Sequence, residues 1–264
     1  IRRPPRSTPK PSSAASDVYK RQELETKYLS TEDVILLRQD PPFDMSYITA
    51  THLLEHIHPE TLVVNDPIQV RNSPEKLLAT HFEGILPPTL ITSNRAQIVT
   101  FREEHRDIIV KPFYGNGGAD VFHILPEDEN LGALLDMFAA KYREPIIVQK
   151  YLPEVRKGDK RIFVINGKVK GCITRVPSKN SNLSNLSQGG TAIKCKLTIK
   201  EKKIASIIAK KLKKDKIFFA GIDFISGYLI GDINVTSPTG LPQLKDLTGN
   251  NLAKYFWDEA RKLK

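Results

Sequence analysis

The chain has 264 residues, enough for one large or two modest domains, and its 40% hydrophobic and 27% charged residues are typical of a globular protein. No run of about 18 apolar residues occurs, so the sequence predicts no helix that spans a membrane. The two cysteines, Cys172 and Cys195, form neither a CxxC motif nor a metal-ligand spacing, which favours a reducing, cytoplasmic location. The formal net charge of +10 raises a nucleic-acid-binding alternative, but no platform of aromatic and basic residues supports it.

Half of this charge lies in residues 1–22, where six Lys and Arg against one Asp give +5. The segment is rich in Pro and Ser and has no hydrophobic period, so we expect it to be disordered. It also lacks the apolar core of a signal peptide. Because it resembles translated adapter sequence, we expect it to be foreign to the protein. A basic arm that binds nucleic acid is the alternative.

From residue 23 the hydrophobic pattern alternates between strands and helices, as in an α/β domain. It predicts strands over 33–37, 61–64 and 90–91, and helices over 46–56, 73–82 and 93–105. Ser73 and Ser93 are the expected N-caps of the last two helices, because a Ser side chain can accept a hydrogen bond from the first helical turn.

The second half of the chain is richer in strand patterns. It predicts strands over 108–112, 121–124, 146–150, 160–165 and 168–176, helices over 130–142, 198–213 and 250–263, and two more strands within 219–238. Asn166–Gly167 is typical of a type I′ hairpin turn, and a turn at Ser226–Gly227 would join the last two strands. This order predicts an α+β unit with an antiparallel sheet, preceded by the last part of an α/β domain.

Three polar side chains stand in the apolar strands near the C-terminus: Asp223, Asp232 and Asn234. Asp232 and Asn234 are two residues apart, so their side chains leave the same face of a strand. If Asp223 lies on the neighbouring strand, three oxygen ligands converge, and such ligands suit Mg²⁺, which usually also binds substrate phosphates. The alternative is a hairpin whose acids face water, which the surrounding Ile, Phe and Val residues disfavour.

A second set of residues suits phosphate binding. Lys111 ends a strand and precedes a glycine-rich turn, where backbone N–H groups can approach phosphate oxygens. The turn matches neither the P-loop nor the dinucleotide fingerprint, and glycine turns between strands are also common without a ligand. Lys76, in the first turn of a helix, can bind phosphate or face solvent. Arg161 and Arg175, beside the Asn166–Gly167 hairpin, can clamp an anion or pack over a sheet edge.

These blocks together match one family. From about residue 33 onward, the chain resembles prokaryotic-type glutathione synthetases, which are ATP-grasp ligases. The resemblance rests on blocks in the family's order: LLRQDPPFD (36–44), NSPEKL (72–77), IIVKPFYGNGGADVF (108–122), VQKYLP (148–153), GDKRIFVINGKV (158–169), ITRVP (173–177), NLSQGG (185–190), GIDFI (221–225) and DINVTSPTG (232–240). The DPPFD and INVTSP motifs separate this family from other ATP-grasp ligases.

The resemblance implies a nucleotide site and a metal site. Lys76 and Lys111 would hold the ATP phosphates, under a mobile loop formed by Gly115, Asn116, Gly117 and Gly118. The hinge that receives adenine would comprise Gln149, Lys150, Tyr151 and Leu152, with Asp159 beside the ribose. The Mg²⁺ ligands, with Mn²⁺ as an alternative metal, would be Asp223, Asp232 and Asn234.

The resemblance also implies catalytic and substrate-binding residues. The catalytic arginines Arg161 and Arg175, together with Asn234 and Ser237, would face the transferred phosphate or the peptide substrate. Asp40, Pro41 and Pro42 would shape the substrate pocket, and residues 177–190 would form a lid.

The implied reaction joins glycine to γ-glutamylcysteine through an acyl phosphate, giving glutathione, ADP and phosphate. The implied assembly is a homo-oligomer, a tetramer by resemblance, with no nucleic acid or membrane as partner. Another ATP-grasp carboxylate–amine ligase, of the glutamate ligase type, is the alternative, and a basic nucleic-acid-binding module is a more remote one.

Three features depart from the family pattern. Asp232 stands where the longer Glu is expected, and Lys150 replaces a small polar residue. Roughly eighty residues of the family's N-terminal domain are absent before residue 33, so we expect a truncated chain with low stability and impaired activity. The expected parts are a foreign segment (1–22), a remnant of the N-terminal substrate-binding α/β domain (23–72) and an ATP-grasp domain (73–264). The ATP-grasp domain would divide into a lid-like subdomain (about 108–153) and a catalytic subdomain (about 154–264).

Overall fold

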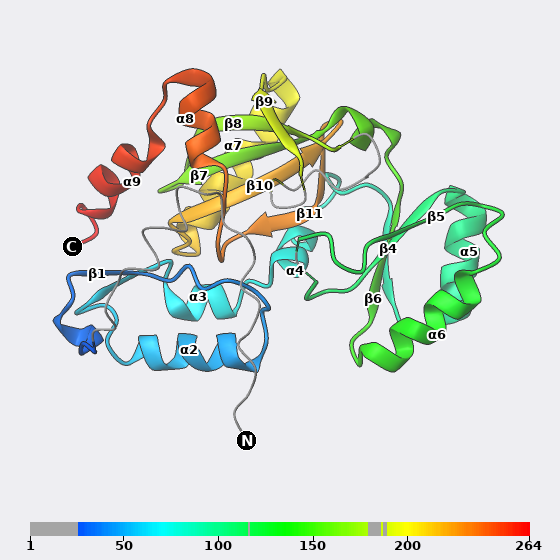
Figure 1. The fold of residues 1–264 in the computed structure, drawn as a ribbon, viewed down its shortest axis with the longest axis horizontal. Helices are drawn as coiled ribbons and strands as arrows, with labels where there is room; N and C mark the ends of the chain where they lie inside the picture. Colours follow the sequence, from blue (N-terminus) through cyan, green and yellow to red (C-terminus); the bar gives the residue numbers. More distant parts are fainter. Residues whose placement is uncertain (1–25, 116, 179–185, 187–188) are drawn as a thin grey trace.

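The computed structural model describes residues 26–115, 117–178, 186 and 189–264, and the predicted foreign segment 1–22 lies outside this range. Within the described residues, the strands form three sheets, of two, five and four strands. Figure 1 shows the five-stranded sheet above the short N-terminal elements, and the four-stranded sheet to the right of both.

The N-terminal elements form a small α/β unit with its own core. After a 3₁₀ turn, η1 (Leu29–Thr31), strand β1 (Val34–Leu36) pairs in parallel with β2 (Leu62–Val64). Helix α2 (Met45–Glu55) connects the two strands, and α3 (Pro67–Arg71) follows β2. The buried side chains of this unit include Tyr47 of α2 and Val63 of β2. The predicted strand–helix–strand order is therefore present here.

The four-stranded sheet is antiparallel, in the order β3-β6-β4-β5. Its strands are β3 (Thr89–Thr92), β4 (Ile108–Lys111), β5 (Phe122–Ile124) and β6 (Ile146–Lys150), and its helices are α5 (Arg95–His105) and α6 (Leu131–Lys141). Ile98 of α5 and Phe138 of α6 pack into one core with Val110 and Val148 of the sheet. Both helices therefore cover the same face, which leaves the opposite face available for a site (Figure 1).

The five-stranded sheet is also antiparallel, in the order β11-β10-β7-β8-β9. A 3₁₀ turn, η2 (Pro153–Lys157), leads into β7 (Asp159–Ile165) and β8 (Lys168–Val176), and the remaining strands are β9 (Thr191–Lys194), β10 (Phe219–Ile225) and β11 (Tyr228–Asn234). Asn166 and Gly167 have φ values of 47° and 72°, as the predicted type I′ turn requires. Ser226 and Gly227 likewise have positive φ, so both predicted turns are confirmed.

Helices bury both faces of this sheet, which explains its long apolar runs. On one face, Ile162 and Val164 of β7 pack against α4 (Glu75–Thr80) and α7 (Ile199–Lys214). On the other face, Phe163 and Ile165 pack against α8 (Leu241–Thr248) and α9 (Leu252–Ala260). Successive residues of β7 thus enter opposite cores, as the strand pleat requires.

The buried Asn65 connects the N-terminal unit to the five-stranded sheet. Its Nδ2 donates to the carbonyl oxygens of Phe219 at 2.8 Å and Val235 at 2.7 Å. The Phe219 N–H donates back to Asn65 Oδ1 at 2.7 Å. All three bonds are buried, so the residue following β2 determines how β10 and the end of β11 meet the N-terminal unit.

Two predicted helix caps are wrong, and five short elements were not predicted. The N-cap position of α4 is Pro74 rather than Ser73, and it has no side-chain cap. Asn94, not Ser93, caps α5, because its Oδ1 accepts from the Ala96 N–H at 2.9 Å. The unpredicted elements are α3, β9, α8 and the 3₁₀ turns η1 and η2, and all are eight residues or shorter, too short for a hydrophobic period to stand out.

Candidate active site

A cavity of about 960 Å³ opens between the free face of the four-stranded sheet and the end of the five-stranded sheet. Among the described residues, it brings together all but one of the predicted site residues: Asp40, Pro41, Lys76, Lys111, Gly115, Gly117, Gly118, Gln149, Lys150, Tyr151, Leu152, Asp159, Arg161, Arg175, Asp223, Asp232, Asn234 and Ser237. Pro42 is exposed and not part of the lining. Asn116 and most of the predicted lid, 177–190, lie outside the described residues.

Two buried lysines face the cavity from different elements. Lys111, at the end of β4, donates through Nζ to the Ile230 carbonyl at 2.9 Å and to Gln149 Oε1 at 3.3 Å. Its burial lowers the pKa of the ammonium group to about 8. Lys76, in the first turn of α4, donates to the carbonyls of Phe113 at 3.1 Å and Gly115 at 2.5 Å. The Lys76 ammonium therefore ties helix α4 to the glycine-rich turn.

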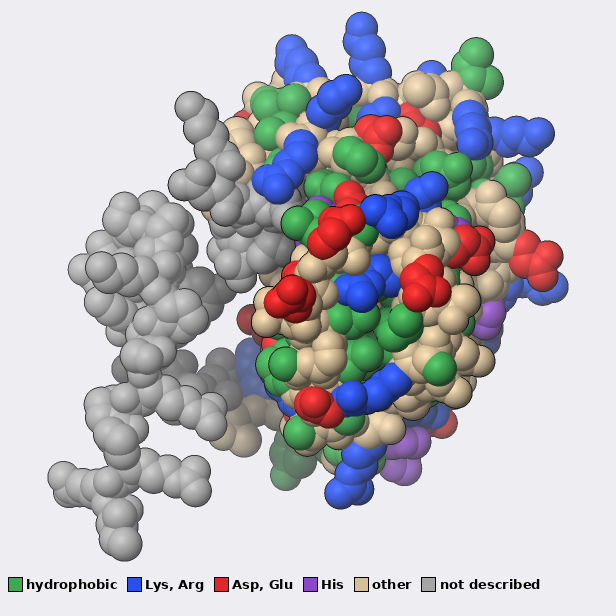
Figure 2. Space-filling view, turned by 90° about the vertical axis from the view of Figure 1, so that its right-hand side faces the viewer, with side chains coloured by type: hydrophobic (Ala, Val, Ile, Leu, Met, Phe, Trp, Pro, Cys, Tyr) green, Lys and Arg blue, Asp and Glu red, His purple; other side chains and the backbone are tan. Residues whose placement is uncertain are grey.

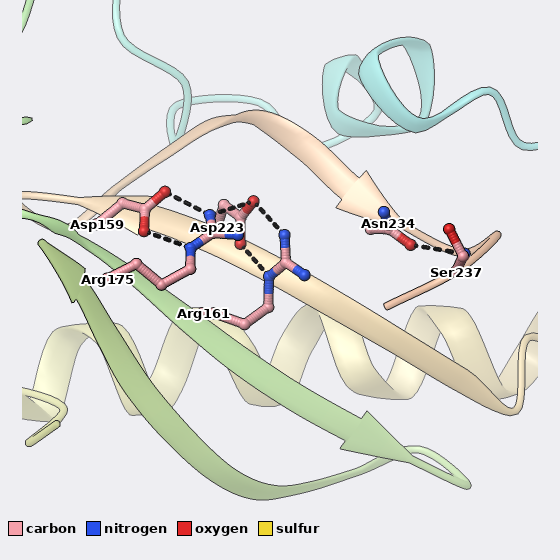
Figure 3. A network of polar contacts seen from close by, with 6 residues as sticks. All are labelled: Asp159, Arg161, Arg175, Asp223, Asn234 and Ser237. Atoms are coloured by element: carbon pink, nitrogen blue, oxygen red, sulfur yellow. Dashed lines mark hydrogen bonds and ion pairs between the residues drawn. The ribbon is translucent and has the colours of Figure 1, made fainter. Parts of the chain in front are cut away.

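Four charged side chains form one buried network on the five-stranded sheet (Figure 3). Arg161 holds Asp223 through two bonds, Nε···Oδ1 at 2.5 Å and Nη2···Oδ2 at 2.8 Å. Arg175 pairs in the same two-bond manner with Asp159, and its Nη2 also lies 2.9 Å from Asp223 Oδ2. Burial raises the pKa of the Asp223 carboxyl, but the charges of Arg161 and Arg175 outweigh burial, so the net pKa is lowered.

The three predicted metal ligands lie in one cavity but not in one contact group. Both Asp223 oxygens are bound by arginines, while Asn234 Oδ1 accepts from the Ser237 N–H at 3.0 Å, away from that network (Figure 3). Asp232 Oδ1 is buried and has no hydrogen-bond partner. A buried carboxylate oxygen without a partner is costly and needs a cation or donor, so this atom fits a metal ion.

Glu75 is a functional candidate that the sequence analysis missed. It precedes Lys76 on α4, lines the cavity, and its Oε1 accepts from the Thr236 hydroxyl at 2.6 Å. Burial, with the charge of Asp232 as a smaller cause, raises the pKa of the Glu75 carboxyl to about 7. The NSPEKL block contained this residue, but only its lysine was assigned a role.

The predicted adenine hinge lies along β6 and the residues that follow it. Gln149 bridges two elements, because its Oε1 accepts from Lys111 and its Nε2 donates to Thr89 Oγ1 at 2.8 Å. Tyr151 stacks on His123, with ring centroids 3.8 Å apart and ring planes 20° apart. No pattern in the sequence pointed to His123, because β4 lies between β5 and β6 in the sheet and the two rings come together only in the fold.

Family comparisons agree with this geometry. Residues 75–249 match the family described as prokaryotic glutathione synthetase, ATP-grasp domain. Residues 6–71 match prokaryotic glutathione synthetase, N-terminal domain, a match that begins within the segment 1–22.

Relatives and solved structures extend this agreement. The glutathione synthetase of Mesorhizobium japonicum is 53% identical over 230 residues, covering 87% of this chain and 73% of the relative. That of Agrobacterium fabrum is 51% identical over 246 residues, covering 93% and 77%. Among solved structures, D-cycloserine synthetase DcsG superposes with a TM-score of 0.69 at 15% identity, covering 92% of this chain and 88% of that one. The D-alanine–D-alanine ligase of Bacillus anthracis gives 0.60 at 15% identity, covering 81% and 76%.

The fold and the site define an ATP-grasp protein, an ATP-dependent carboxylate–amine ligase. The two family matches, and relatives that share more than half of their aligned residues with this chain, identify the family. The chain belongs to the prokaryotic glutathione synthetase family. It is therefore a ligase of glutathione biosynthesis that uses ATP and small-molecule substrates. Among the described residues, no helix has the length and hydrophobicity needed to cross a membrane.

Proposed function

We propose that the chain joins glycine to γ-glutamylcysteine in an ATP- and Mg²⁺-dependent reaction through an acyl phosphate, releasing ADP and phosphate. One observation carries the proposal: a single cavity is lined by Lys76, Lys111, Arg161, Arg175 and the unpartnered Asp232. Cations for a triphosphate and for the transferred group, together with a carboxylate that can hold a metal ion, suit phosphoryl transfer.

The lysines would bind the nucleotide phosphates. Lys111 has a lowered pKa because its ammonium group is buried, and a bound phosphate would stabilise the charged form. Lys76 would keep the glycine-rich turn close to the same phosphates, because it already binds the Gly115 carbonyl. Gln149, Lys150, Tyr151 and Leu152 would receive adenine, with Asp159 on the ribose side.

The arginines would neutralise charge on the group that is transferred. The γ-glutamylcysteine carboxylate attacks the γ-phosphate, and negative charge develops on the transferring oxygens. Arg161 and Arg175 are fixed by Asp223 and Asp159, so their guanidinium groups need not reorganise as that charge appears. The glycine amine then displaces phosphate from the acyl phosphate, with the substrates held by Asn234, Ser237 and the loop at Asp40–Pro41.

Asp223, Asp232 and Asn234 would hold the metal, with Asp232 as the principal ligand because its Oδ1 has no partner. When bound, Mg²⁺ would neutralise phosphate charge during the transfer. Oxygen ligands without His or Cys favour Mg²⁺, and Mn²⁺ would fit the same set. For all three residues to bind the metal, an Asp223 carboxylate oxygen such as Oδ2 would have to leave Arg161 and Arg175.

The decisive experiment measures ADP release by the 264-residue chain with γ-glutamylcysteine, glycine and Mg²⁺, omitting each of the three in turn. Release that requires all three supports the proposal. Release with glutamate in place of glycine would indicate a glutamate ligase instead. Nucleotide binding by the same sample without ADP release under any condition would contradict the proposed activity of this chain. Lys111→Met should abolish release, while Lys254→Met, on an exposed helix face, is the matched control.

The proposal extends to a cytoplasmic homotetramer that binds no nucleic acid. Charges of both signs mix on the face formed by the four-stranded subdomain (Figure 2), where Arg95, Arg106 and Lys141 pair with Asp136, Glu127 and Asp120. Such a face is not a continuous basic footprint for a phosphate backbone. Light scattering after size-exclusion chromatography would measure the number of chains in the assembly. Affinity for DNA or RNA that falls steeply with salt concentration would contradict the proposed absence of nucleic-acid binding.

A further inference from the structure

The only two cysteines of the chain face each other at the edge of the five-stranded sheet. Strands β8 and β9 pair in antiparallel fashion, with Thr174 opposite Ile193 and Ile173 opposite Lys194. The next position outward in this register places Cys172 opposite Cys195. They are 23 residues apart in the sequence, so no spacing motif announced the pair.

This arrangement suits a disulfide. Residues directly opposite on antiparallel strands have Cα atoms about 4.5–5.5 Å apart, and a disulfide needs a Cα separation of about 4.4–6.8 Å. The two thiols already share a hydrogen bond, in which Cys172 is the donor. Both side chains are only partly buried, so a small molecule can reach them from solvent. The strands would therefore need little movement to join the sulfurs.

The surroundings distinguish the two thiols. The hydrogen bond from Cys172 is the largest cause that lowers the pKa of Cys195, and the Thr174 hydroxyl acts in the same direction on Cys195 alone, whereas the Lys160 charge favours both thiolates. The same bond raises the pKa of Cys172. Lys160 is held beside the pair, because its Nζ donates to the Lys196 carbonyl at 3.0 Å and to Glu201 Oε1 at 2.9 Å. Cys195 accepts hydrogen bonds from both Cys172 and Thr174, which stabilise its thiolate, so we assign Cys195 as the attacking thiol and Cys172 as the resolving thiol.

We propose that Cys172 and Cys195 form a thiol–disulfide exchange site that takes a low-molecular-weight disulfide and closes reversibly into a bond between β8 and β9. The Cys195 thiolate attacks one sulfur of the disulfide RS–SR, whose S–S bond breaks and releases RS⁻. Cys172 then loses its proton to solvent and attacks the Cys195 sulfur of the mixed disulfide, and the second RS⁻ leaves. The two protein thiols are oxidised to one disulfide, and RS–SR is reduced to two thiols.

A disulfide between Cys172 and Cys195 would fix β9, an edge strand of the five-stranded sheet. In the described part of the chain, β9 pairs with β8, which also carries Arg175 of the buried charge network. A bond at Cys172, three residues before Arg175, would fix β9 against that part of β8. The exchange chemistry itself requires only the two thiols and their neighbours, so it does not depend on the proposed ligase activity.

The test is intact-mass analysis and thiol titration of dilute wild-type protein treated with glutathione disulfide. We expect both thiols to disappear, with a mass loss of two hydrogens per chain, and dithiothreitol to restore both. Cys172→Ser should instead hold one glutathione adduct on Cys195, because nothing resolves the mixed disulfide. Cys195→Ser should react at least 10-fold more slowly than Cys172→Ser.

Wild-type protein that keeps both thiols, or that carries two stable adducts, would overturn the proposal. So would equal reaction rates of the two serine variants. A disulfide only between two chains, seen as a doubled mass, would also overturn it. The wild-type measurement needs no substitution, so it is decisive even if a variant fails to fold.

Discussion

Arg161 and Asp223 lie directly opposite each other on β7 and β10, and two side-chain hydrogen bonds join them across the strands. Both side chains are buried, so each charge depends on the other for neutralisation. Asp223 also neutralises Arg175, which makes it the central anion between two cations. In this structure the main role of Asp223 is to neutralise the charges of Arg161 and Arg175.

We therefore expect Asp223→Asn to lower the free energy of unfolding by about 3 kcal/mol, because it leaves two buried arginines undercompensated. Urea denaturation without nucleotide or metal measures this effect. Asp232→Asn is the matched variant. Since Asp232 Oδ1 has no partner, its neutralisation should leave the unfolding free energy unchanged or raised, yet increase the Mg²⁺ concentration required for ADP release. Equal destabilisation by both variants would refute this division of roles.

Gly221 provides the space that Arg161 occupies. A Cβ built on Gly221 would lie 2.9 Å from Arg161 Cδ, too close for the side chain to stay in place, and 3.1 Å from its Nε, which is also a tight contact. Gly221→Ala should displace the guanidinium group from Asp223, cost about 1–3 kcal/mol of stability and reduce ADP release at least 10-fold. Gly132→Ala in α6 is the control, because nothing lies within 4 Å of its added Cβ. That change should stabilise the helix by up to about 1 kcal/mol and leave activity intact. Similar activity in the two variants would contradict the prediction.

Lys111 should cost the ligand-free protein stability at neutral pH. Its pKa falls from 10.5 to about 8 on folding, because burial disfavours the ammonium form. Between these values the unfolded chain binds more protons than the folded one, so stability rises with pH, by about 3 kcal/mol in total. Lys111→Met should therefore be more stable than wild type at pH 7, with a gain that shrinks toward pH 10, while nucleotide affinity falls. Urea titrations at both pH values measure the difference, and a pH-independent gain would contradict the burial argument.

Much of this site could be predicted because its residues interrupt strand patterns. Asp223 and Asn234 stand in otherwise apolar strands, and the observed register brings them and their neighbours to one cavity. The pleat of a strand determines which face of the sheet each side chain occupies, so residue spacing alone predicted which polar side chains of these strands share a face. Turn residues were informative as well, because Asn166, Gly167 and Gly227 tolerate the positive φ values that the two confirmed hairpin turns contain.

Other relationships arise only from contacts between distant segments. Arg161, which binds Asp223, is 62 residues away from it in the sequence. Nothing in the local pattern shows that Arg161 and Arg175 bind carboxylates of the protein rather than the substrate. Glu75 looked like an ordinary first-turn acid, because its burial depends on Thr236, far along the chain. Cys172 and Cys195 meet through β9, a short and mostly exposed strand that hydrophobic periodicity cannot detect.

Glu75 should make stability depend on pH in the opposite sense to Lys111. Its pKa rises from 4.5 to about 7 on folding, chiefly through burial. Between these values the folded chain keeps a proton that the unfolded chain releases, so stability falls as pH rises from 4.5 to about 7. Glu75→Gln keeps an oxygen acceptor for Thr236 without the charge. It should match wild type near pH 4.5 and exceed it by about 3 kcal/mol at pH 8. An equal difference at both pH values would show that Glu75 does not titrate as argued.

Asn65 should be among the most sensitive polar positions outside the cavity. Asn65→Ala removes three buried hydrogen bonds and leaves both polar backbone groups of Phe219 and the Val235 carbonyl without this partner. At about 1–3 kcal/mol for each unsatisfied group, partly relieved by relaxation, we expect a loss of about 4 kcal/mol in urea denaturation. Asn250→Ala removes one exposed bond of 3.3 Å and should change stability by less than about 0.5 kcal/mol. Asn65→Asp separates packing from hydrogen bonding: it keeps the acceptor for the Phe219 N–H but turns a charged oxygen toward two carbonyls. It should therefore destabilise at pH 7 at least as much as Ala does, and a near-neutral Asn65→Asp would show that the donor bonds contribute little.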